Sequence, residues 1–341
     1  MNQRIGYREA VARQPESLAE AAAKVAEYLG TLDLSAFADR SIGFAGIGAS
    51  FQAALAGALY LRNRNRASYA YCPTDLYGAV DSAAEAFVAL SASGQSREIA
   101  DVMKLRDTLP RIAVCRSPDT PLAGITGMQL PFYSGADNGA SSTGYTGMLL
   151  GIGMLCDALT GRPDPVWNIL PGLVAQVLSS QADAADAAAG LLAGRTSIDI
   201  VGAGAGFATA GEAAMLIREA VRVPAAGWDT LNYLHGPMES QDAATGLIAL
   251  GAGREVKVAI DVAAFGCRSV LVTTRDDIET SERLVVLRVP RVENEIAAAI
   301  LDIVAVQMVV GVMQDAANLT NITFRYRQTD TKLKPWSPTE V

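Results

Sequence analysis

Short apolar runs alternate with longer segments of helical periodicity along most of this chain. The short runs predict strands at residues 41–45, 67–71, 86–90, 111–115 and 128–131. The longer segments predict helices over 51–61, 99–105 and 145–159, and an amphipathic helix over 8–29 whose regular part begins near Pro15. Strands and helices that alternate at this spacing predict a parallel sheet with helices on both faces.

The opening pattern of strand, glycine turn and helix returns later in the chain. At a constant offset of 156 residues, Ser41-Ile42, Gly46, Gly48, Phe51, Ala54, Ala58 and Arg62 match Ser197-Ile198, Gly202, Gly204, Phe207, Ala210, Ala214 and Arg218. A repeat of this length indicates two copies of one domain. The second copy continues with predicted strands at 246–250, 269–273 and 284–289 and a last helix over 295–314.

These patterns predict an α/β fold of two tandem flavodoxin-like parallel-sheet domains, each a three-layer α/β/α sandwich. One long Ala-rich helix is expected over 167–193, after the break at Gly161-Arg-Pro-Asp-Pro165. The expected divisions are an N-terminal helical segment (1–34), a first domain (35–165), a linker helix (166–194), a second domain (195–320) and a C-terminal tail (321–341).

A serine-rich loop follows one predicted strand and precedes a predicted helix. The hydroxyls of Ser91, Ser93 and Ser96, together with Gly94 and the free N–H groups of the helix start, can hold a dianionic phosphate. A simpler interpretation makes Ser96 the N-cap of the helix, with Glu98 favoured by the positive end of the helix dipole.

The two copies differ where chemistry is expected. The first copy's serine loop falls opposite Ala249-Leu-Gly-Ala-Gly253, which has no hydroxyls. Glu219 in the second copy stands where the first has Asn63, and the segment from Trp228 to Pro237 has no counterpart in the first copy. Duplicated domains that differ in this way suggest one composite site.

Charge and composition exclude several kinds of partner and binding site. The 341 residues carry a net charge of -8, which argues against nucleic acid as a partner. We find no uninterrupted apolar run long enough for a bilayer and no signal core, so we expect a cytoplasmic protein with no membrane partner. The single histidine excludes a His-rich metal site, and the four cysteines are far apart with no CxxC pair.

Both glycine turns match part of the dinucleotide-binding motif G-x-G-x-x-G. Gly46-x-Gly48 and Gly202-x-Gly204 supply two glycines, but Phe51 and Phe207 replace the third. A tight turn with close helix packing explains the glycines that remain. We therefore expect no nicotinamide, flavin or other cofactor.

Two tandem domains, a Ser-x-Ser-Gly-x-Ser loop in the first and a His235-Gly-Pro237 turn in the second together resemble the sugar isomerase (SIS) family. The chain is similar to the isomerase half of glucosamine-6-phosphate synthase and to its stand-alone relatives. Those relatives are phosphosugar aldose–ketose isomerases, amino-sugar-phosphate deaminases and fructosamine deglycases. The resemblance covers nearly the whole chain, including the leading Arg13-Gln-Pro-Glu16 segment.

The resemblance implies roles for particular residues. Glu219 matches the carboxylate that moves a proton between C1 and C2, and His235 matches the histidine that opens the sugar ring. In the family this histidine comes from the neighbouring subunit, so the resemblance implies a homodimer. Helical spacing also permits an ordinary ion pair of Glu219 with Arg218 or Arg222. The implied substrate- and phosphate-binding residues are Gly48, Ser50, Ser91, Ser93, Gly94, Ser96, Ser142 and Thr143.

The sequence departs from the family pattern at several positions. The lysine that usually follows the Ser-Thr of the third loop is absent, and Ala49 replaces a usual threonine. The tail carries Lys332 and Lys334 near the family's active-site lysine, and the sequence does not decide between them.

Two function classes follow for this chain. The first is an enzyme acting on a sugar phosphate by C1/C2 proton transfer, as an isomerase, a deaminase or a deglycase. The second is a non-catalytic regulatory protein that binds a sugar phosphate. A binding protein needs no proton-transfer carboxylate, so Glu219 together with His235 favours the enzyme. The sequence leaves the three reactions, and the identity of the sugar phosphate, open.

Overall fold

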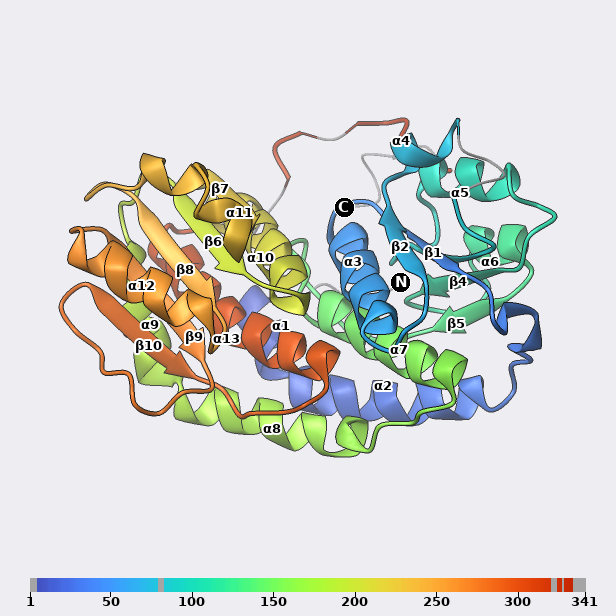
Figure 1. Ribbon diagram of the computed structural model, residues 1–341, viewed down its shortest axis with the longest axis horizontal. Helices are drawn as coiled ribbons and strands as arrows, with labels where there is room; N and C mark the ends of the chain where they lie inside the picture. The colour runs from blue at the N-terminus through green and yellow to red at the C-terminus, as the bar shows by residue number, and fades with distance from the viewer. Residues whose placement is uncertain (1–4, 79–82, 320–323, 327, 334–341) are drawn as a thin grey trace. The chain divides into compact units, whose positions relative to one another are not determined.

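The computed structural model describes residues 5–78, 83–319, 324–326 and 328–333 (Figure 1). The chain forms two compact units. Unit A comprises Ser17–Gly135, Gly144–Asn168 and Phe324–Val341, and unit B comprises Met1–Glu16, Ala136–Thr143 and Ile169–Thr323. These units are not a test of the domain boundaries expected from the sequence, which remain predictions.

Unit A is built on a five-stranded parallel sheet. The strands follow the order β2-β1-β3-β4-β5. Every residue of β3 is buried, which is typical of a parallel strand covered on both faces. The strands are β1 (Ile42–Ala45), β2 (Ser68–Tyr71), β3 (Ala86–Leu90), β4 (Arg111–Cys115) and β5 (Gln129–Pro131).

Unit B repeats this topology. Its parallel sheet has the order β7-β6-β8-β9-β10, so its first strand is again flanked by the second and the third. The expected fold of two flavodoxin-like parallel sheets is confirmed. The strands are β6 (Ile198–Gly202), β7 (Ala225–Asp229), β8 (Gly246–Leu250), β9 (Arg268–Thr273) and β10 (Leu284–Arg288).

Strand β7 was not among the predicted strands. Its sequence, Ala225-Ala-Gly-Trp-Asp229, contains no β-branched residue, and only Ala225 is buried. Gly227 allows α10 to approach the strand, because a Cβ there would lie 2.6 Å from the backbone nitrogen of Gly211. The strand therefore forms through its ladder to β6 and its contact with α10 rather than through intrinsic propensity.

Helices cover both faces of the sheet in unit A (Figure 1). On one face Ile99 of α5 packs in a core cluster with Phe87 of β3. On the other face α3, β1 and α7 meet closely, because a Cβ at Gly57 would lie 2.6 Å from Ile152 and 2.9 Å from Phe44. The helices of this part of the chain are α2 (Gln14–Leu29), η1 (Ser35–Phe37), α3 (Ala49–Arg62), α4 (Pro73–Leu76), α5 (Arg97–Lys104), α6 (Pro121–Thr126) and α7 (Thr143–Thr160).

Unit B has the same layered arrangement (Figure 1). Val262 of α12 packs with Leu247 and Leu271 on one face, while α9 and α13 contact strands on the other. The helices are α1 (Tyr7–Ala12), α8 (Val166–Ser180), α9 (Ala182–Leu192), α10 (Ala205–Leu216), the π-helical turn η2 (Ile217–Val221), α11 (Thr230–Tyr233), η3 (Pro237–Ser240), α12 (Arg254–Ala264) and α13 (Glu295–Ala316).

The first strand of each unit leads into the same unusual backbone turn. Gly48 has φ 61° and ψ -131°, and Gly204 has φ 56° and ψ -128°. Only glycine adopts this conformation readily, because it has no Cβ. The second glycine of each G-x-G pair is therefore explained by turn geometry, in agreement with the structural interpretation of the motif.

Two helices expected to be continuous are divided. The predicted helix over 167–193 is α8 followed by α9, with a break at Gln181. The Gln181 side-chain oxygen accepts the backbone N–H of Arg288 at 2.8 Å, so the break is held by a contact distant in sequence. The predicted helix over 8–29 is α1 followed by α2, and Pro15 stands in the first turn of α2 as expected.

Helix α13 is long and apolar enough to cross a bilayer by length and composition, although Asp302 and Gln307 interrupt its apolar residues. It has 22 residues and its most apolar stretch has a mean hydropathy of 2.3. However, 78% of that stretch is buried, and the helix contacts α1, α9 and α10 within unit B. A helix that is apolar all round is expected where protein surrounds it, so α13 is the core helix of this unit.

Candidate active site

The serine loop lies between β3 and α5, as predicted, within unit A. Ser91 Oγ and Ser96 Oγ are 3.0 Å apart, and Ser91 Oγ also accepts the Ser96 N–H at 3.4 Å. Ser93 is exposed, and its hydroxyl accepts the Gln95 N–H at 3.3 Å. Ser96 occupies the N-cap position, but its side chain makes no capping hydrogen bond. Three hydroxyls therefore precede an eight-residue helix, with Ser93 exposed, Ser96 partly buried and Ser91 buried against Ser96.

The corresponding loop of unit B is shorter and has no hydroxyl. Residues 251–253 join β8 to α12, whereas residues 91–96 join β3 to α5. The equivalent strands end at Leu90 and Leu250, so the true pairing is one residue from the predicted pairing of Leu90 with Ala249. The two loops still differ when they are aligned at the strand ends, because only the loop of unit A carries serines.

Gly94 gives the serine loop its shape. Its φ of +63° lies in the left-handed region, and a Cβ at this position would lie 2.3 Å from Cβ of Thr120. Thr120 caps α6 by accepting the Ala123 N–H at 3.3 Å, so it is not free to move aside. Gly94 is therefore required by both the conformation and the space of the loop.

We expect Gly94→Ala to destabilise the folded protein by about 1–3 kcal/mol, because alanine at positive φ is strained. The measurement is the free energy of unfolding in denaturant. Gly190→Ala is the matched control, since no atom lies within 4 Å of a Cβ built on Gly190 in α9. Helix propensity predicts that this control gains about 0.5–1 kcal/mol. Equal stability of the two variants would contradict the role given to Gly94.

The C-terminal tail pairs with the serine loop inside unit A. Lys332 and Ser96 form an isolated antiparallel bridge. The backbone N–H of Leu333 donates to the Gln95 carbonyl at 2.9 Å. The Arg97 side chain also donates to the Lys332 carbonyl at 3.1 Å. The tail is thus attached to the same short segment that carries the hydroxyls.

This pairing distinguishes Lys332 from Lys334, between which the sequence did not decide. Lys332 is the residue paired with the loop, and Lys334 lies outside the described residues. Part of the Lys332 side chain is exposed. The pKa of its amine is nevertheless lowered, because desolvation outweighs the attraction of Glu98, which acts to raise it. A lowered lysine pKa increases the fraction of neutral, nucleophilic amine near neutral pH.

The first glycine turn positions Gly48 and Ser50 at the start of α3, also in unit A. Ser50 is buried, and its carbonyl would lie 2.3 Å from a Cβ on Gly46. Both predicted residues therefore belong to one compact turn at the carboxyl end of β1. This end of a parallel strand is where ligands bind in open α/β sheets.

The loop that carries Ser142 and Thr143 is organised by a buried carboxylate in unit B. Asp137 accepts the Ser142 N–H at 3.0 Å and the Ser142 hydroxyl at 2.8 Å. The Thr143 hydroxyl donates to the carbonyl of Ala136 at 2.9 Å. Both predicted hydroxyls thus donate their protons to acceptors inside the loop.

Glu219 lies in η2, the π-helical turn that follows α10 in unit B. Such turns are rare and are frequent at functional sites. The side chain is half-buried, and burial raises the pKa of its carboxyl to about 7. Arg218 donates to the carbonyl of Ala225 at 2.7 Å, and Glu219 has no ion pair within the part of the chain that the structure describes. A carboxyl with this pKa can act as a base near neutral pH.

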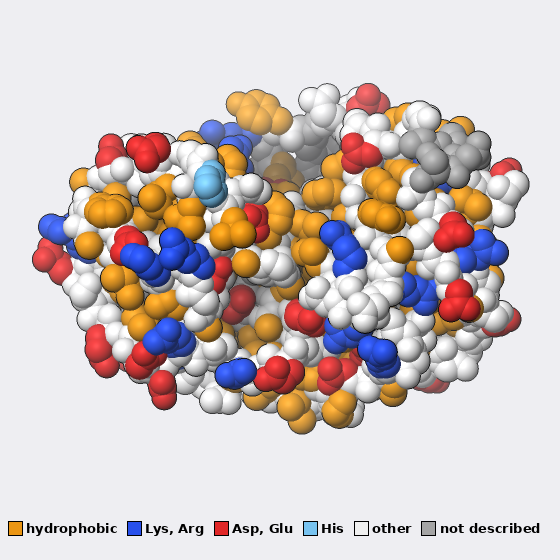
Figure 2. Space-filling view, viewed as in Figure 1, with side chains coloured by type: hydrophobic (Ala, Val, Ile, Leu, Met, Phe, Trp, Pro, Cys, Tyr) orange, Lys and Arg blue, Asp and Glu red, His pale blue; other side chains and the backbone are white. Residues whose placement is uncertain are grey.

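His235 lies in unit B, in the turn between α11 and η3, and its side chain is exposed. The single histidine is visible in pale blue on the surface in Figure 2. Its backbone N–H donates to Asn232 at 3.1 Å, and Gly236 follows with φ 146°. Asp229 caps α11 through the N–H groups of Leu231 and Asn232, as expected of a cap residue. The turn therefore exposes the imidazole to solvent.

Sequence reasoning missed a group of buried polar side chains in unit B. Glu212 in α10 is 1% exposed, Tyr7 in α1 is 2% exposed and Asp137 is 4% exposed. The hydroxyl of Tyr7 and Oε2 of Glu212 have no hydrogen-bond partner among the described residues. The only available signal was the charge of Glu212 in a helix otherwise composed of small and apolar residues. Tyr7 belongs to no motif and gave no signal in the sequence.

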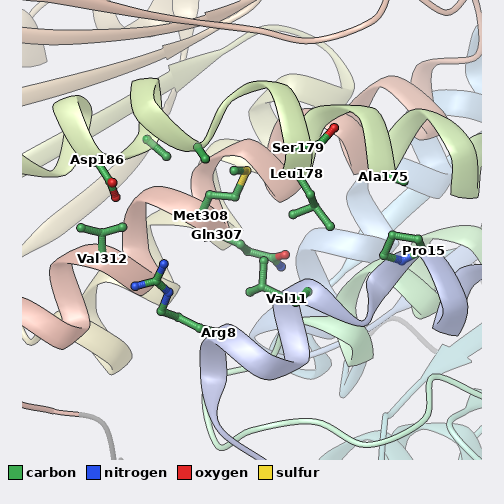
Figure 3. Close-up of a pocket in the computed structure, with 13 residues that line it drawn as sticks. Arg8, Val11, Pro15, Ala175, Leu178, Ser179, Asp186, Gln307, Met308 and Val312 are labelled. Atoms are coloured by element: carbon green, nitrogen blue, oxygen red, sulfur yellow. The ribbon is translucent and has the colours of Figure 1, made fainter.

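A cavity of about 500 Å³ lies between α1, α8, α9 and α13 in unit B (Figure 3). Its walls are mostly apolar, with Val11, Leu178 and Met308 among them, and the Gln307 amide points between the helices. The Gln307 oxygen accepts from Gln14 at 2.6 Å. None of the predicted site residues lines this cavity, so it is separate from the candidate chemistry.

Comparison with known proteins gives the fold. No protein-family model matches the chain. No curated protein matches it either. Among solved structures, the C-terminal domain of glucosamine-fructose-6-phosphate aminotransferase from Francisella tularensis has a TM-score of 0.80 at 15% identity, over 93% of this chain and 97% of that chain. The chain has the sugar isomerase (SIS) fold.

Two further similar structures carry different activities in their names. Tagatose-6-phosphate ketose/aldose isomerase from Escherichia coli has a TM-score of 0.76 at 14% identity, over 94% of this chain and 96% of that chain. Glucosamine-6-phosphate deaminase from Thermotoga maritima has a TM-score of 0.68 at 15% identity, over 91% and 96%. The SIS fold expected from the sequence is confirmed, and because one fold hosts several chemistries the reaction must be argued from the site.

Proposed function

We propose that this chain is an enzyme that moves a proton between C1 and C2 of an open-chain sugar phosphate, as an isomerase or a deaminase. The observation that carries the proposal is Glu219, a half-buried carboxyl whose pKa is raised to about 7 on a π-helical turn. Removal of a proton next to a carbonyl needs a base that is partly ionised at the working pH. The names of the similar structures, which include an isomerase and a deaminase of sugar phosphates, support this substrate class.

The serine loop is the proposed seat of the phosphate. Ser91, Ser93 and Ser96 carry hydroxyls at the N-terminus of α5, where the helix dipole favours an anion. Hydrogen bonds to a charged acceptor are roughly twice as strong as neutral ones. Gly48, Ser50 and Gly94 lie in the same unit as this loop and are also proposed to bind the substrate. Ser142 and Thr143 remain proposed contacts of the substrate.

Lys332 is the proposed tail lysine. Its backbone pairs with Ser96, and desolvation lowers the pKa of its amine. A neutral amine can add to the carbonyl of the open-chain sugar and form a Schiff base with loss of water. In its charged form the same amine can instead stabilise negative charge that develops on O1.

His235 is the proposed group that opens the sugar ring. An imidazole can give and take a proton near neutral pH, which ring opening requires at the ring oxygen and at O1. Its exposed position in a Gly-Pro turn suits a side chain presented to a neighbouring subunit. We therefore propose a homodimer in which His235 acts in the partner's site.

The decisive test is a screen of aldose, ketose, amino-sugar and fructosamine phosphates in D2O. We expect deuterium to enter C1 or C2 of at least one compound, together with ketose formation or ammonia release, measured by NMR. Sugar phosphates that bind but never exchange would identify a regulatory binding protein instead. Light scattering on the same sample tests the dimer, and a monomer at micromolar concentration would exclude a shared site.

A further inference from the structure

One carboxylate in unit B binds both ends of the segment that carries His235. Asp199, the second residue of β6, accepts the indole N–H of Trp228 at 3.1 Å through Oδ1. It also accepts the side-chain amide of Gln241 at 2.8 Å through Oδ2. Trp228 precedes the last residue of β7 and Gln241 directly follows η3, so the 228–241 segment leaves the sheet and returns to the same side chain. Compact surface loops whose ends meet in this way are frequently functional.

The repeat supplies a comparison for this position. At the offset of 156 residues the equivalent of Asp199 is Gly43, which is likewise the second residue of the first strand of its sheet. A Cβ on Gly43 would lie 2.5 Å from the Phe87 ring, so the packing of unit A leaves no room for a side chain there. The carboxylate therefore occurs in the copy that carries the 228–241 segment and is absent from the equivalent position of the other copy.

The closure of this segment requires an acceptor at both oxygens of Asp199. The side chain is partly buried, and burial raises the pKa of its carboxyl, whereas the hydrogen bonds from Trp228 and Gln241 lower it. An ionised carboxylate accepts hydrogen bonds at both oxygens, so it suits two donors. Asparagine can accept only one of them, because its amide nitrogen is itself a donor. Asp199→Asn therefore keeps the size of the side chain and loses one end of the closure.

The half of the segment that follows His235 depends most on this closure. Before His235, Tyr233 of α11 is fully buried in the apolar core of unit B. After His235, η3 contains no buried residue. Gln241 comes next, and its Nε2 donates to Asp199 while its Oε1 accepts the Thr245 hydroxyl at 3.1 Å. The place of His235 is thus set by a buried ring on one side and by the Asp199 closure on the other.

We propose that Asp199 is a positioning residue for His235, and that its hydrogen bonds to Trp228 and Gln241 fix the point from which the imidazole reaches the sugar ring. This inference rests on the proposed function, in which His235 opens the ring. Asp199 acts through the segment and not on the substrate. The sheet has a separate support, because β7 pairs with β6 along its whole length. Loss of the closure is therefore expected to loosen the segment while the fold remains.

Amide hydrogen exchange followed by mass spectrometry tests the closure without any substrate. In Asp199→Asn we expect peptides that cover 230–241 to exchange about tenfold faster or more, the effect of losing one hydrogen bond to a charged group, while β6 and β8 keep their protection. Trp228→Phe and Gln241→Met each remove one donor without changing β6, so the test stands even where Asp199→Asn does not fold. Unchanged exchange of the segment in the folded variants would overturn the inference.

Turnover separates positioning of His235 from a general loss of stability. The substrates are the sugar phosphate that exchanges deuterium fastest in the screen and its deoxy analogue without the ring-closing hydroxyl, which for fructose 6-phosphate is the 5-deoxy compound. We expect Asp199→Asn to slow turnover of the cyclic compound by about 10- to 100-fold, the cost of a misplaced catalytic group, and to change exchange with the open-chain analogue by less than about twofold. Equal losses with both compounds would contradict a positioning role.

Asp157 in unit A provides the matched control. It too is a buried aspartate that accepts a tryptophan indole N–H, from Trp167 at 2.7 Å, and it also accepts the Tyr60 hydroxyl at 2.6 Å. Asp157→Asn therefore disturbs a similar set of hydrogen bonds in the unit without the histidine. We expect it to lower the temperature of thermal unfolding and to keep the wild-type ratio of cyclic to open-chain rates. If this control lowers the ratio as much as Asp199→Asn does, the effect comes from stability and the inference is wrong.

The results distinguish this inference from the proposed function. If the wild type exchanges deuterium with sugar phosphates and Asp199→Asn changes cyclic and open-chain rates alike, proton transfer stands and the positioning role is wrong. If the wild type exchanges with no sugar phosphate, the proposed function is wrong. The role of Asp199 in ring opening then fails with it, whatever the hydrogen exchange of the segment.

Discussion

Glu219→Gln is expected to abolish deuterium exchange at C1 and C2 while leaving substrate binding nearly intact. Glutamine has the shape of glutamate but cannot act as a base near neutral pH. The fall in the rate of deuterium exchange therefore measures the loss of proton transfer alone. General bases contribute on the order of 100- to 10,000-fold to rates, and we expect a loss in that range. The measurement is the rate of deuterium incorporation by NMR, with affinity from calorimetry.

Two controls make the Glu219 result specific. Glu279→Gln changes an exposed glutamate of unit B and should exchange at the wild-type rate. His235→Ala should lose turnover on cyclic sugars but recover part of its rate on open-chain analogues, because its proposed role ends once the ring is open. Wild-type exchange by Glu219→Gln would remove the main support for the enzyme.

The pH dependence of the reaction should follow the same carboxyl. The base must be ionised, and burial raises its pKa from the usual value near 4.5 to about 7. The rate at low substrate is therefore expected to rise with pH through about 7 and to level off above it. An acid limb near pH 4.5 would indicate an exposed carboxylate and would exclude Glu219 as the base.

Ser93→Ala is expected to weaken binding of phosphorylated sugars and to leave unphosphorylated sugars unaffected. The hydroxyl of Ser93 is exposed at the tip of the loop, so its removal opens no cavity in the core. A hydrogen bond to a charged group contributes about 1.5–3 kcal/mol, equivalent to about 10- to 150-fold in affinity. Calorimetry with each sugar and its phosphate measures the difference directly.

A serine outside the loop serves as the control for this result. Ser281→Ala removes an exposed hydroxyl in unit B and should leave both affinities unchanged. If Ser93→Ala binds phosphorylated and unphosphorylated sugars as the wild type does, the anion is not held by this loop.

The sequence by itself determined the repeated fold. The apolar runs and the glycine pairs recur at a constant offset, and each predicts its structure from local spacing alone. Gly48 and Gly204 have nearly the same backbone angles because the same turn is encoded twice. The serine loop was also placed correctly, since a strand, a loop and a helix that follow one another in sequence are adjacent in space.

Only the tertiary structure decided where distant segments meet. Local spacing carries no information on the pairing of Lys332 with Ser96, because more than 200 residues separate them. The break at Gln181 likewise depends on a hydrogen bond from Arg288. The raised pKa of Glu219 and the unpartnered oxygens of Glu212 and Tyr7 arise from burial. Burial depends on packing by helices from other parts of the chain, so these properties exist only in the folded protein.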